Sequence, residues 1–186
     1  MSIWSVIGSR CLPREWEARV NGVVDLLLAR GHRICSGGAV GTDLVVLRSL
    51  VRHGASACRG SLVYLPGDTS LVPDPCVPWL DKFIGLGGRV VEGSASDASS
   101  RQEFVSALLI RNCYIVRASA GVVAFVSHDS PGSWFTVEQA IRRDKPVVVF
   151  PVDGPSCLRH FVAGSWVPSR SLAGAYVFNY IEKDKT

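Results

Sequence analysis

The sequence lacks the features of a metal-binding, secreted or membrane-spanning protein. Six cysteines are scattered through 186 residues without a CxxC pair, and the four histidines show no metal-ligand spacing, so structural zinc is disfavoured. No apolar run approaches the roughly 20 residues that span a bilayer, and the opening MSIWSVIGSR does not resemble a secretory signal. We therefore expect a cytoplasmic protein with free thiols, no membrane partner, no metal and no cofactor.

The chain also lacks strong charge, internal repeats and any sign of a second domain. Its 20 Lys and Arg against 16 Asp and Glu give a net charge of +4, while 47% of residues are hydrophobic and 19% are charged. This composition argues against extensive disorder and is compatible with a nucleotide or nucleic-acid partner without implying one. We expect one domain over residues 1–186, in which 153–186 form a C-terminal extension where the pattern weakens.

Short β-branched apolar runs alternate with longer amphipathic segments along the chain. The runs predict strands at 3–7, 33–35, 61–65, 89–91, 121–126 and 146–150. The amphipathic segments predict helices at 13–30, 44–53, 77–86, 101–117 and 136–143. Residues 174–183 could add a last strand at an edge, and 68–78 are expected to form a loop.

Strand runs such as VVAFV and VVVFP are apolar throughout, which is typical of a parallel sheet covered by helices on both faces. The sequence therefore predicts an α/β fold with a single Rossmann-like, doubly wound, mostly parallel sheet.

Turns after three of the predicted strands have the ingredients of an anion site. Ligands of doubly wound sheets bind outside the carboxyl ends of the strands, so these turns are expected at one edge. The first turn contains an arginine, whose planar guanidinium suits a phosphate, and the second has closely spaced glycines before a helix. The turns contain Gly8, Ser9 and Arg10; Ser36, Gly37, Gly38, Gly41, Thr42 and Asp43; and Gly132, Ser133, Trp134 and Thr136. Alternatively, the glycines serve only tight packing, Asp43 caps a helix and Arg10 is a surface charge.

Four further side chains are candidates for the same edge. Arg111 and Asn112 lie in the predicted helix 101–117, where Arg111 could reach over the sheet or simply face solvent. Glu138 is expected in the first turn of the next helix, where it complements the helix dipole or works with Arg111 as an acid or base. Trp134, in a polar turn, is the candidate for stacking on a base; burial against a partner subunit is the alternative.

In order and spacing, VIGSR, SGGAVGTD, RNCYIVRAS, VVAF, PGSWFTVEQA and KPVVVFP resemble the superfamily that joins DNA-processing protein A (DprA, or Smf) with the LOG nucleotide hydrolases. The resemblance covers roughly residues 3–152 and is closer to the DprA branch, whose GSR turn, SG-x-A-x-G-x-D turn, RN pair and SGS-x-x-T turn match 8–10, 36–43, 111–112 and 132–136. It implies a Rossmann-like domain that binds nucleotides or single-stranded DNA, usually as a homodimer.

The LOG branch implies a different use of the same positions. Its PGG-x-GT-x-E turn supplies a Glu that works with a helix Arg to cleave the base from a nucleoside monophosphate. Here PGSWFTVE keeps Glu138 at the matching place, with Arg111 at a comparable helix position, but Ser133 and Phe135 replace glycines. The chain has no room for the N-terminal helical domain or the C-terminal winged helix that many DprA proteins carry.

Three functions follow, of which we prefer a module that binds a nucleotide or nucleotide-derived ligand. The alternatives are a single-stranded DNA-binding protein and a phosphoribohydrolase with Arg111 and Glu138 as its catalytic pair. The expected ligand-binding residues are Gly8, Ser9, Arg10, Ser36, Gly37, Gly38, Gly41, Thr42, Asp43, Arg111, Asn112, Gly132, Ser133, Trp134 and Thr136.

Overall fold

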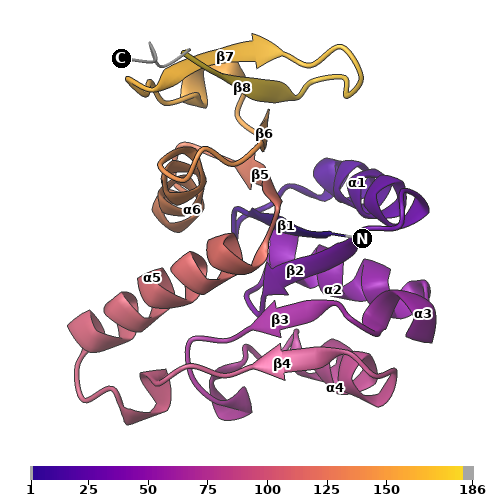
Figure 1. The fold of residues 1–186 in the computed structure, drawn as a ribbon. Coiled ribbons are helices and arrows are strands. Elements are labelled where there is room, and N and C mark those ends of the chain that lie inside the picture. The colour runs from indigo at the N-terminus through magenta and orange to yellow at the C-terminus, as the bar shows by residue number, and fades with distance from the viewer. Residues whose placement is uncertain (1, 182–186) are drawn as a thin grey trace.

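A single sheet with helices on both faces organises the protein. The structure is a computed structural model that describes residues 2–181. Its strands run in the order β4-β3-β2-β1-β5-β6-β8-β7 (Figure 1). All neighbouring pairs from β4 to β6 are parallel, whereas β8 pairs antiparallel with both β6 and β7. The strands are β1 Ile3–Gly8, β2 Arg33–Gly37, β3 Leu62–Tyr64, β4 Arg89–Val91, β5 Gly121–Val126, β6 Val147–Pro151, β7 Gly164–Pro168 and β8 Tyr176–Tyr180.

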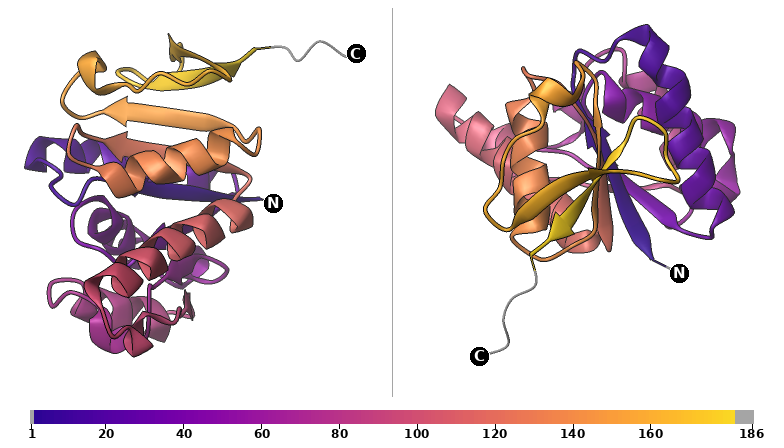
Figure 2. Two further views of the ribbon diagram at one scale, coloured as in Figure 1. Left: turned by 90° about the vertical axis from the view of Figure 1, so that its left-hand side faces the viewer. Right: turned by 90° about the horizontal axis from the view of Figure 1, so that it is seen from above.

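The helices divide between the two faces of the sheet. Helices α1 to α4 cover one face, and α5 and α6 cover the other (Figures 1 and 2). The helices are α1 Glu17–Ala29, α2 Thr42–Arg52, α3 Ala55–Cys58, α4 Val77–Gly85, α5 Arg101–Ala118 and α6 Pro131–Ile141. Short 3₁₀ turns lie at Arg14–Trp16, Thr69–Leu71, Ala95–Asp97 and Pro155–Cys157. The expected α/β fold is therefore confirmed.

Each face has its own hydrophobic core because successive side chains of a strand point to opposite faces. Val6, Phe125 and Phe150 pack against α1 and α2, while Ile7 and Val126 pack against α5 and α6. Every residue of β5 is buried, which explains why its sequence is apolar throughout.

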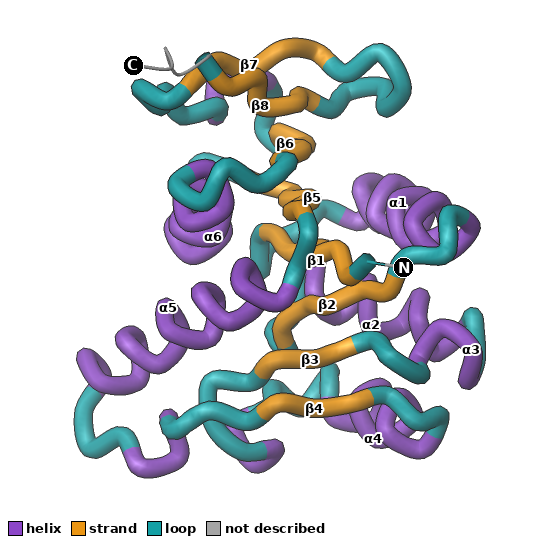
Figure 3. Tube along the Cα trace, viewed as in Figure 1, coloured by secondary structure: helices purple, strands orange, loops and turns teal. Residues whose placement is uncertain are grey.

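The direction of winding reverses between β1 and β5. The chain builds outward from β1 to β4 and then returns to the other side of β1 (Figure 3). The connection after β1 leads to α1 on one face, and the connection after β5 leads to α6 on the opposite face. Since the two connections diverge, a crevice forms at the carboxyl ends of these strands.

The start of helix α6 differs from the predicted start. Helix α6 begins at Pro131, with Ser130 as its N-cap residue, whereas its predicted start is residue 136. Proline is tolerated in the first helical turn, so the PGSWF segment belongs to the helix and is not a turn. Consequently Glu138 lies about two turns into α6 and not in its first turn.

The C-terminal segment contains a hairpin that the sequence revealed only in part. The predicted last strand corresponds to β8, but β8 lies inside the sheet and β7 forms the edge. Strand β7, GSWVP, is short and ends in proline, so it lacks a strand signature. Nowhere in residues 2–181 does a helix have the length and apolar character needed to cross a bilayer.

Candidate anion-binding site

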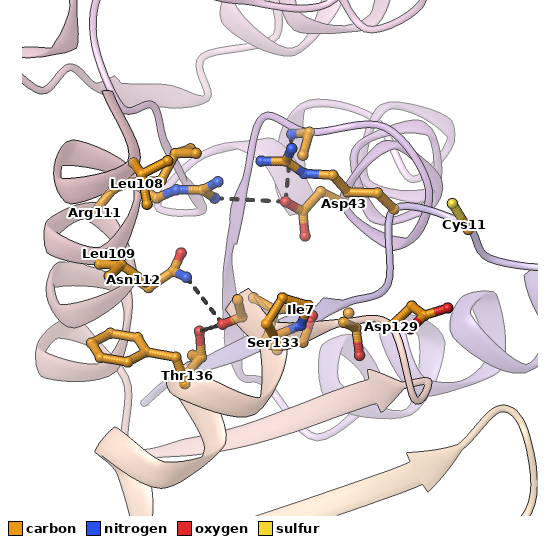
Figure 4. A pocket seen from close by; sticks show the side chains of 18 residues that line it. Ile7, Cys11, Asp43, Leu108, Leu109, Arg111, Asn112, Asp129, Ser133 and Thr136 are labelled. Atoms are coloured by element: carbon orange, nitrogen blue, oxygen red, sulfur yellow. Dashed lines mark hydrogen bonds and ion pairs between the residues drawn. The ribbon is translucent and has the colours of Figure 1, made fainter. Parts of the chain in front are cut away.

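A cavity of about 580 Å³ lies at the point where the winding reverses. Its walls come from the turn after β1, the turn after β2, helix α5 and the first turns of α6 (Figure 4). Of the residues expected to bind ligand, those that line it are Gly8, Arg10, Asp43, Arg111, Asn112, Gly132, Ser133 and Thr136. The structure thus brings parts of all the predicted motifs to one cavity.

Arg111 and Asp43 form a buried ion pair in the wall of the cavity. Arg111, from α5, is only 7% exposed, and its Nη1 lies 3.6 Å from Asp43 Oδ2. Asp43 also accepts hydrogen bonds from Ser36 Oγ at 3.2 Å and from the Ala39 amide at 3.4 Å. The N-cap residue of α2 is Gly41, so the expectation that Asp43 caps this helix is wrong.

Burial and pairing act in opposite directions on the two charges. Burial raises the pKa of the Asp43 carboxyl, and the nearby Arg111 charge opposes that rise. Burial likewise lowers the pKa of Arg111, and the attraction of Asp43 opposes that fall. Each group therefore needs an opposite charge beside it to remain ionised at low cost. That charge comes from the other member of the pair or from a ligand that carries the same charge as that member.

The glycines of the SGGAVGTD turn make room for the protein itself. A Cβ at Gly37 would overlap Arg111 Nη1 and Asp43 Oδ2, and a Cβ at Gly38 would overlap the side chain of Leu65. Gly41 has a φ of +76° and packs against the backbone of the turn after β1. The expectation that these glycines clear space for a ligand is wrong for Gly37, Gly38 and Gly41, because their space holds the ion pair and neighbouring chain.

Three small polar residues fix the loops instead of lining the cavity. The Ser9 carbonyl accepts hydrogen bonds from Thr42 N at 3.0 Å and Thr42 Oγ1 at 3.1 Å. The Ser9 amide donates to Phe125 O at 2.7 Å, and Ser36 Oγ donates to Val6 O at 2.7 Å. These bonds hold the ends of β1, β2 and β5 against the start of α2, so Ser9, Ser36 and Thr42 position the wall and do not line the cavity.

Arg10 lines the cavity without a direct ion-pair partner among the described residues. Its side chain is exposed and, within residues 2–181, has no hydrogen bond or ion pair. After burial and the mutual attraction of Asp43 and Arg111, the Arg10 charge lowers the pKa of both groups, so it acts on the same cluster. Two guanidinium groups thus share one carboxylate, which leaves one surplus positive charge on this wall.

Arg111 also carries an unused donor. Its Nε is buried and has no hydrogen-bond partner among the described residues. An unsatisfied buried donor costs about 1–3 kcal/mol, and more when it is charged. Arg111 lines the cavity, so this unused donor belongs to a side chain in the cavity wall.

The opposite wall is built where α5 meets α6. Asn112 Nδ2 donates to the Gly132 carbonyl at 3.2 Å, and Thr136 Oγ1 donates to the same oxygen at 2.9 Å (Figure 4). Among residues 2–181 no side chain caps the N-terminus of α6, whose residues Gly132 and Ser133 line the cavity. Uncapped N–H groups of a helix favour an anion at this end.

Trp134 is absent from the cavity, so the prediction that it stacks on a base is wrong. It is 1% exposed, its Nε1 donates to Ser127 O at 3.2 Å, and its ring packs against Phe161 and Trp166. Its neighbour Phe135 lines the cavity instead. Within a helix that begins at Pro131, adjacent residues face different directions, and Trp134 falls on the buried side with Val137 and Ile141.

Glu138 is not placed beside Arg111. Its carboxylate pairs with Arg142 on the next turn of α6 at 2.6 Å, and it does not line the cavity. The cavity has a different acidic residue, the exposed Asp129, in the connection after β5. The pair expected for acid and base chemistry is therefore not assembled.

Several lining residues were missed in the sequence, mainly those that make an apolar wall. They are Ile7, Cys11, Ala39, Val105, Leu108, Leu109, Asp129, Ser130, Pro131 and Phe135. Three of these residues could have been found from the sequence. Val105, Leu108 and Leu109 precede Arg111 and Asn112 on α5 by about one to two helical turns. No cluster of His, Cys, Asp or Glu that could hold a metal occurs in the described part of the chain.

The fold and the site together define a class of protein. A doubly wound sheet with a cavity at its switch point, lined by two arginines and two aspartates, is a Rossmann-like architecture. The family model of DNA recombination-mediator protein A matches residues 1–159. The chain belongs to that family.

Solved structures share the fold at low sequence identity. DNA processing protein A from Helicobacter pylori, which binds single-stranded DNA, has 18% identity and a TM-score of 0.61, with 80% of this chain and 64% of that chain covered. The Streptococcus pneumoniae protein has 19% identity and a TM-score of 0.58, with 79% and 49% covered. A molybdenum cofactor binding protein from Rippkaea orientalis has 16% identity and a TM-score of 0.54, with 81% and 76% covered.

The solved structures support the fold, and the family model supports the family. The chain corresponds to only 64% and 49% of the length of the two DNA processing proteins. No curated protein matches the sequence.

Proposed function

We propose that the cavity at the switch point binds the phosphate of a nucleotide or nucleotide-derived ligand between Arg10 and Arg111. The observation that carries the proposal is the buried Arg111, whose Nε has no partner among the described residues beside a cavity of about 580 Å³. Arg10 adds an unpaired guanidinium, and planar guanidinium groups suit phosphate oxygens. Family membership supports the same ligand class.

The remaining walls suit the other parts of a nucleotide. Phe135, Val105 and Leu109 offer an apolar surface for a base. Asn112 and the exposed Asp129 offer hydrogen-bonding groups for sugar hydroxyls or base edges. Apolar walls with a few polar groups are the usual composition of small-molecule sites.

Calorimetry with a panel of nucleoside monophosphates tests the proposal. Replacing Arg10 with Ala removes an exposed charge without touching a core, and we expect affinity to fall about tenfold or more. Arg170→Ala is the matched control, since Arg170 is also exposed and does not line the cavity. Absence of heat with every nucleotide, or equal affinity of the Arg10→Ala and wild-type proteins, would refute the proposal.

A second candidate is single-stranded DNA binding at the same arginines, favoured by the family and by the Helicobacter pylori relative. The net charge of +4 offers little additional attraction to a polyanion. Gel-shift binding of an oligothymidylate that weakens steeply with salt supports this candidate, and no shift at low salt dismisses it.

Hydrolysis of the ligand receives less support than binding. Glu138 pairs with Arg142 and does not line the cavity, so the catalytic pair expected of Arg111 and Glu138 is not assembled. Incubation with nucleoside monophosphates followed by chromatography provides the test, and base release that Glu138→Gln abolishes would restore the hydrolase hypothesis.

We also propose a homodimer in a cytoplasmic, reducing environment. Ile110 and Tyr114, four residues apart on one face of α5, leave 52% and 49% of their surfaces exposed, which supports a protein interface there. The free thiols of Cys35, Cys58, Cys76 and Cys157, all buried, fit a reducing compartment. Sedimentation equilibrium tests the oligomeric state, and localisation of a tagged full-length protein tests the compartment.

A further inference from the structure

Helix α5 packs most closely against the rest of the protein near its C-terminal end. Of its 18 residues only Arg111, Ile115 and Val116 are buried, and its N-terminal half extends away from the strands (Figures 1 and 2). That half carries Val105 and Leu109 of the cavity wall. Since the helix is held mainly at one end, the contacts at that end decide where the wall lies.

Lys145 binds the C-terminal end of α5 from a different segment. It lies in the turn between α6 and β6, and its Nζ donates hydrogen bonds to Val116 O at 2.6 Å, to Arg117 O at 3.4 Å and to Ser119 O. Each of the three protons of the ammonium therefore has an acceptor. The last carbonyls of a helix lack partners within the helix, and the helix dipole favours a cation beside them. Lys145 thus caps α5 from outside the helix.

The backbone of Lys145 is itself held on both sides. Its amide donates to Ala140 O in α6 at 3.1 Å, and its carbonyl accepts from the Tyr180 hydroxyl of β8 at 2.5 Å. The ammonium therefore connects the end of α5 to α6 and to the sheet. Since its own side chain does not line the cavity, Lys145 can act on the cavity only through these elements.

The two helices that Lys145 joins form neighbouring walls of the cavity. Arg111 and Asn112 come from α5, and Gly132 and Ser133 come from the first turn of α6. Asn112 Nδ2 donates to Gly132 O at 3.2 Å, so this hydrogen bond depends on how the two helices are placed. Arg111 lies about two turns before the end of α5, close enough for a shift of that end to reach it.

We infer that Lys145 is a positioning residue, which holds α5 against α6 so that Arg111 and Asn112 take their places in the cavity wall. For its effect on a ligand, the inference rests on the proposed function. The placement of the two helices can be tested without a ligand.

The side-chain amide of Asn112 reports on the placement of the helices. In two-dimensional proton–nitrogen NMR spectra its signals are assigned by their absence from Asn112→Ala. Lys145→Met keeps the apolar stem but has no donor, so we expect it to shift these signals as Nδ2 moves relative to Gly132 O. Lys145→Arg keeps the charge and the N–H donors and should restore the wild-type signals.

Calorimetry with thymidine 5′-monophosphate measures the consequence for binding. We expect Lys145→Met to weaken binding about tenfold and Lys145→Arg to retain most of the affinity. Val20→Ala is the matched control, since Val20 is buried in the core on the opposite face of the sheet. This substitution lowers stability without touching α5 or α6, and it should leave the affinity unchanged.

Thermal denaturation shows whether each variant folds. If Lys145→Met does not fold, Tyr180→Phe takes its place, because it removes only the hydroxyl that holds the Lys145 carbonyl. It should shift the same Asn112 signals by a smaller amount.

The outcomes separate this inference from the proposed function. Unchanged Asn112 signals in Lys145→Met, or in Tyr180→Phe where Lys145→Met does not fold, overturn the positioning role. Shifted signals with unchanged affinity overturn it as well, and so does an equal loss of affinity in Val20→Ala, because binding would then follow stability alone. Absence of binding in the wild-type protein refutes the proposed function, while shifted Asn112 signals still support Lys145 as the residue that places α5.

Discussion

Replacing Asp43 with Asn tests the role of the buried ion pair. The amide keeps the shape of the side chain and an oxygen that accepts from Ser36 Oγ, but it removes the charge that faces Arg111 at 3.6 Å and the second oxygen, which accepts from the Ala39 amide. Breaking one side of a buried pair typically costs about 3–5 kcal/mol, because the remaining charge is left uncompensated. For a chain of this size we therefore expect the melting temperature to fall by about 10 °C.

The same substitution should strengthen the site for anions. Without Asp43, the Arg10 and Arg111 charges are no longer partly neutralised, and a bound phosphate replaces the missing carboxylate. Inorganic phosphate should consequently raise the melting temperature of Asp43→Asn more than that of the wild type. At a concentration 100 times the dissociation constant, the linkage stabilises the folded state by about 2.7 kcal/mol.

Differential scanning calorimetry with and without phosphate, at constant ionic strength, measures both effects. Asp81→Asn is the control, since Asp81 is exposed on α4 and has no partner in the described part of the chain. An unchanged melting temperature for Asp43→Asn would show that the pair is not important for stability. Equal phosphate effects on the variant and the wild type would show that the anion does not bind at Arg111.

Further substitutions test the account at single positions. Gly37→Ala should destabilise the fold, because its Cβ would overlap the Arg111 and Asp43 side chains, whereas Gly22→Ala in α1 meets nothing within 4 Å and should stabilise it by about 0.5–1 kcal/mol in urea unfolding. Trp134→Ala should cost about 3–5 kcal/mol of stability, while Phe135→Ala should mainly lower nucleotide affinity; the reverse pattern would reinstate Trp134 as the stacking residue. Burial raises the pKa of the Cys35 thiol from 9.0 to about 12, so the folded state holds this proton more tightly than the unfolded state. The stability that this provides is complete below pH 9.0 and is lost by about 1.4 kcal/mol per pH unit as pH rises toward 12. Cys35→Ala should therefore flatten the decline of the urea-unfolding free energy at alkaline pH. Parallel declines in the variant and the wild type would contradict this assignment.

The fold was largely predictable because its signals are local and repeated. Apolar β-branched runs such as 121–126 mark strands buried on both faces, and glycines such as Gly31 end the helices between them. The start of α6 was mispredicted because PGSWF has the composition of a turn, although proline also begins helices. Strand β7 was missed because it is stabilised by pairing with β8 and not by its own sequence pattern.

The position of the site at the edge of the sheet was predictable from the sequence, but the contacts of its individual side chains were not. Topology brings the ends of β1, β2 and β5 together, so Arg10, Asp43 and Gly132 were correctly expected near one edge. The pairing of Arg111 with Asp43 depends on how α5 crosses the sheet, which no short motif encodes. For the same reason the role of Gly37 was misjudged: the group that it accommodates comes from a helix more than 70 residues later in the chain.

The most direct test of the central claim compares a nucleoside monophosphate with the corresponding nucleoside, by calorimetry on the wild-type protein. If Arg10 and Arg111 hold a phosphate, the monophosphate binds and the nucleoside binds at least about tenfold more weakly. Equal affinities would show that the phosphate is not recognised, and would contradict the assignment of this cavity as an anion site.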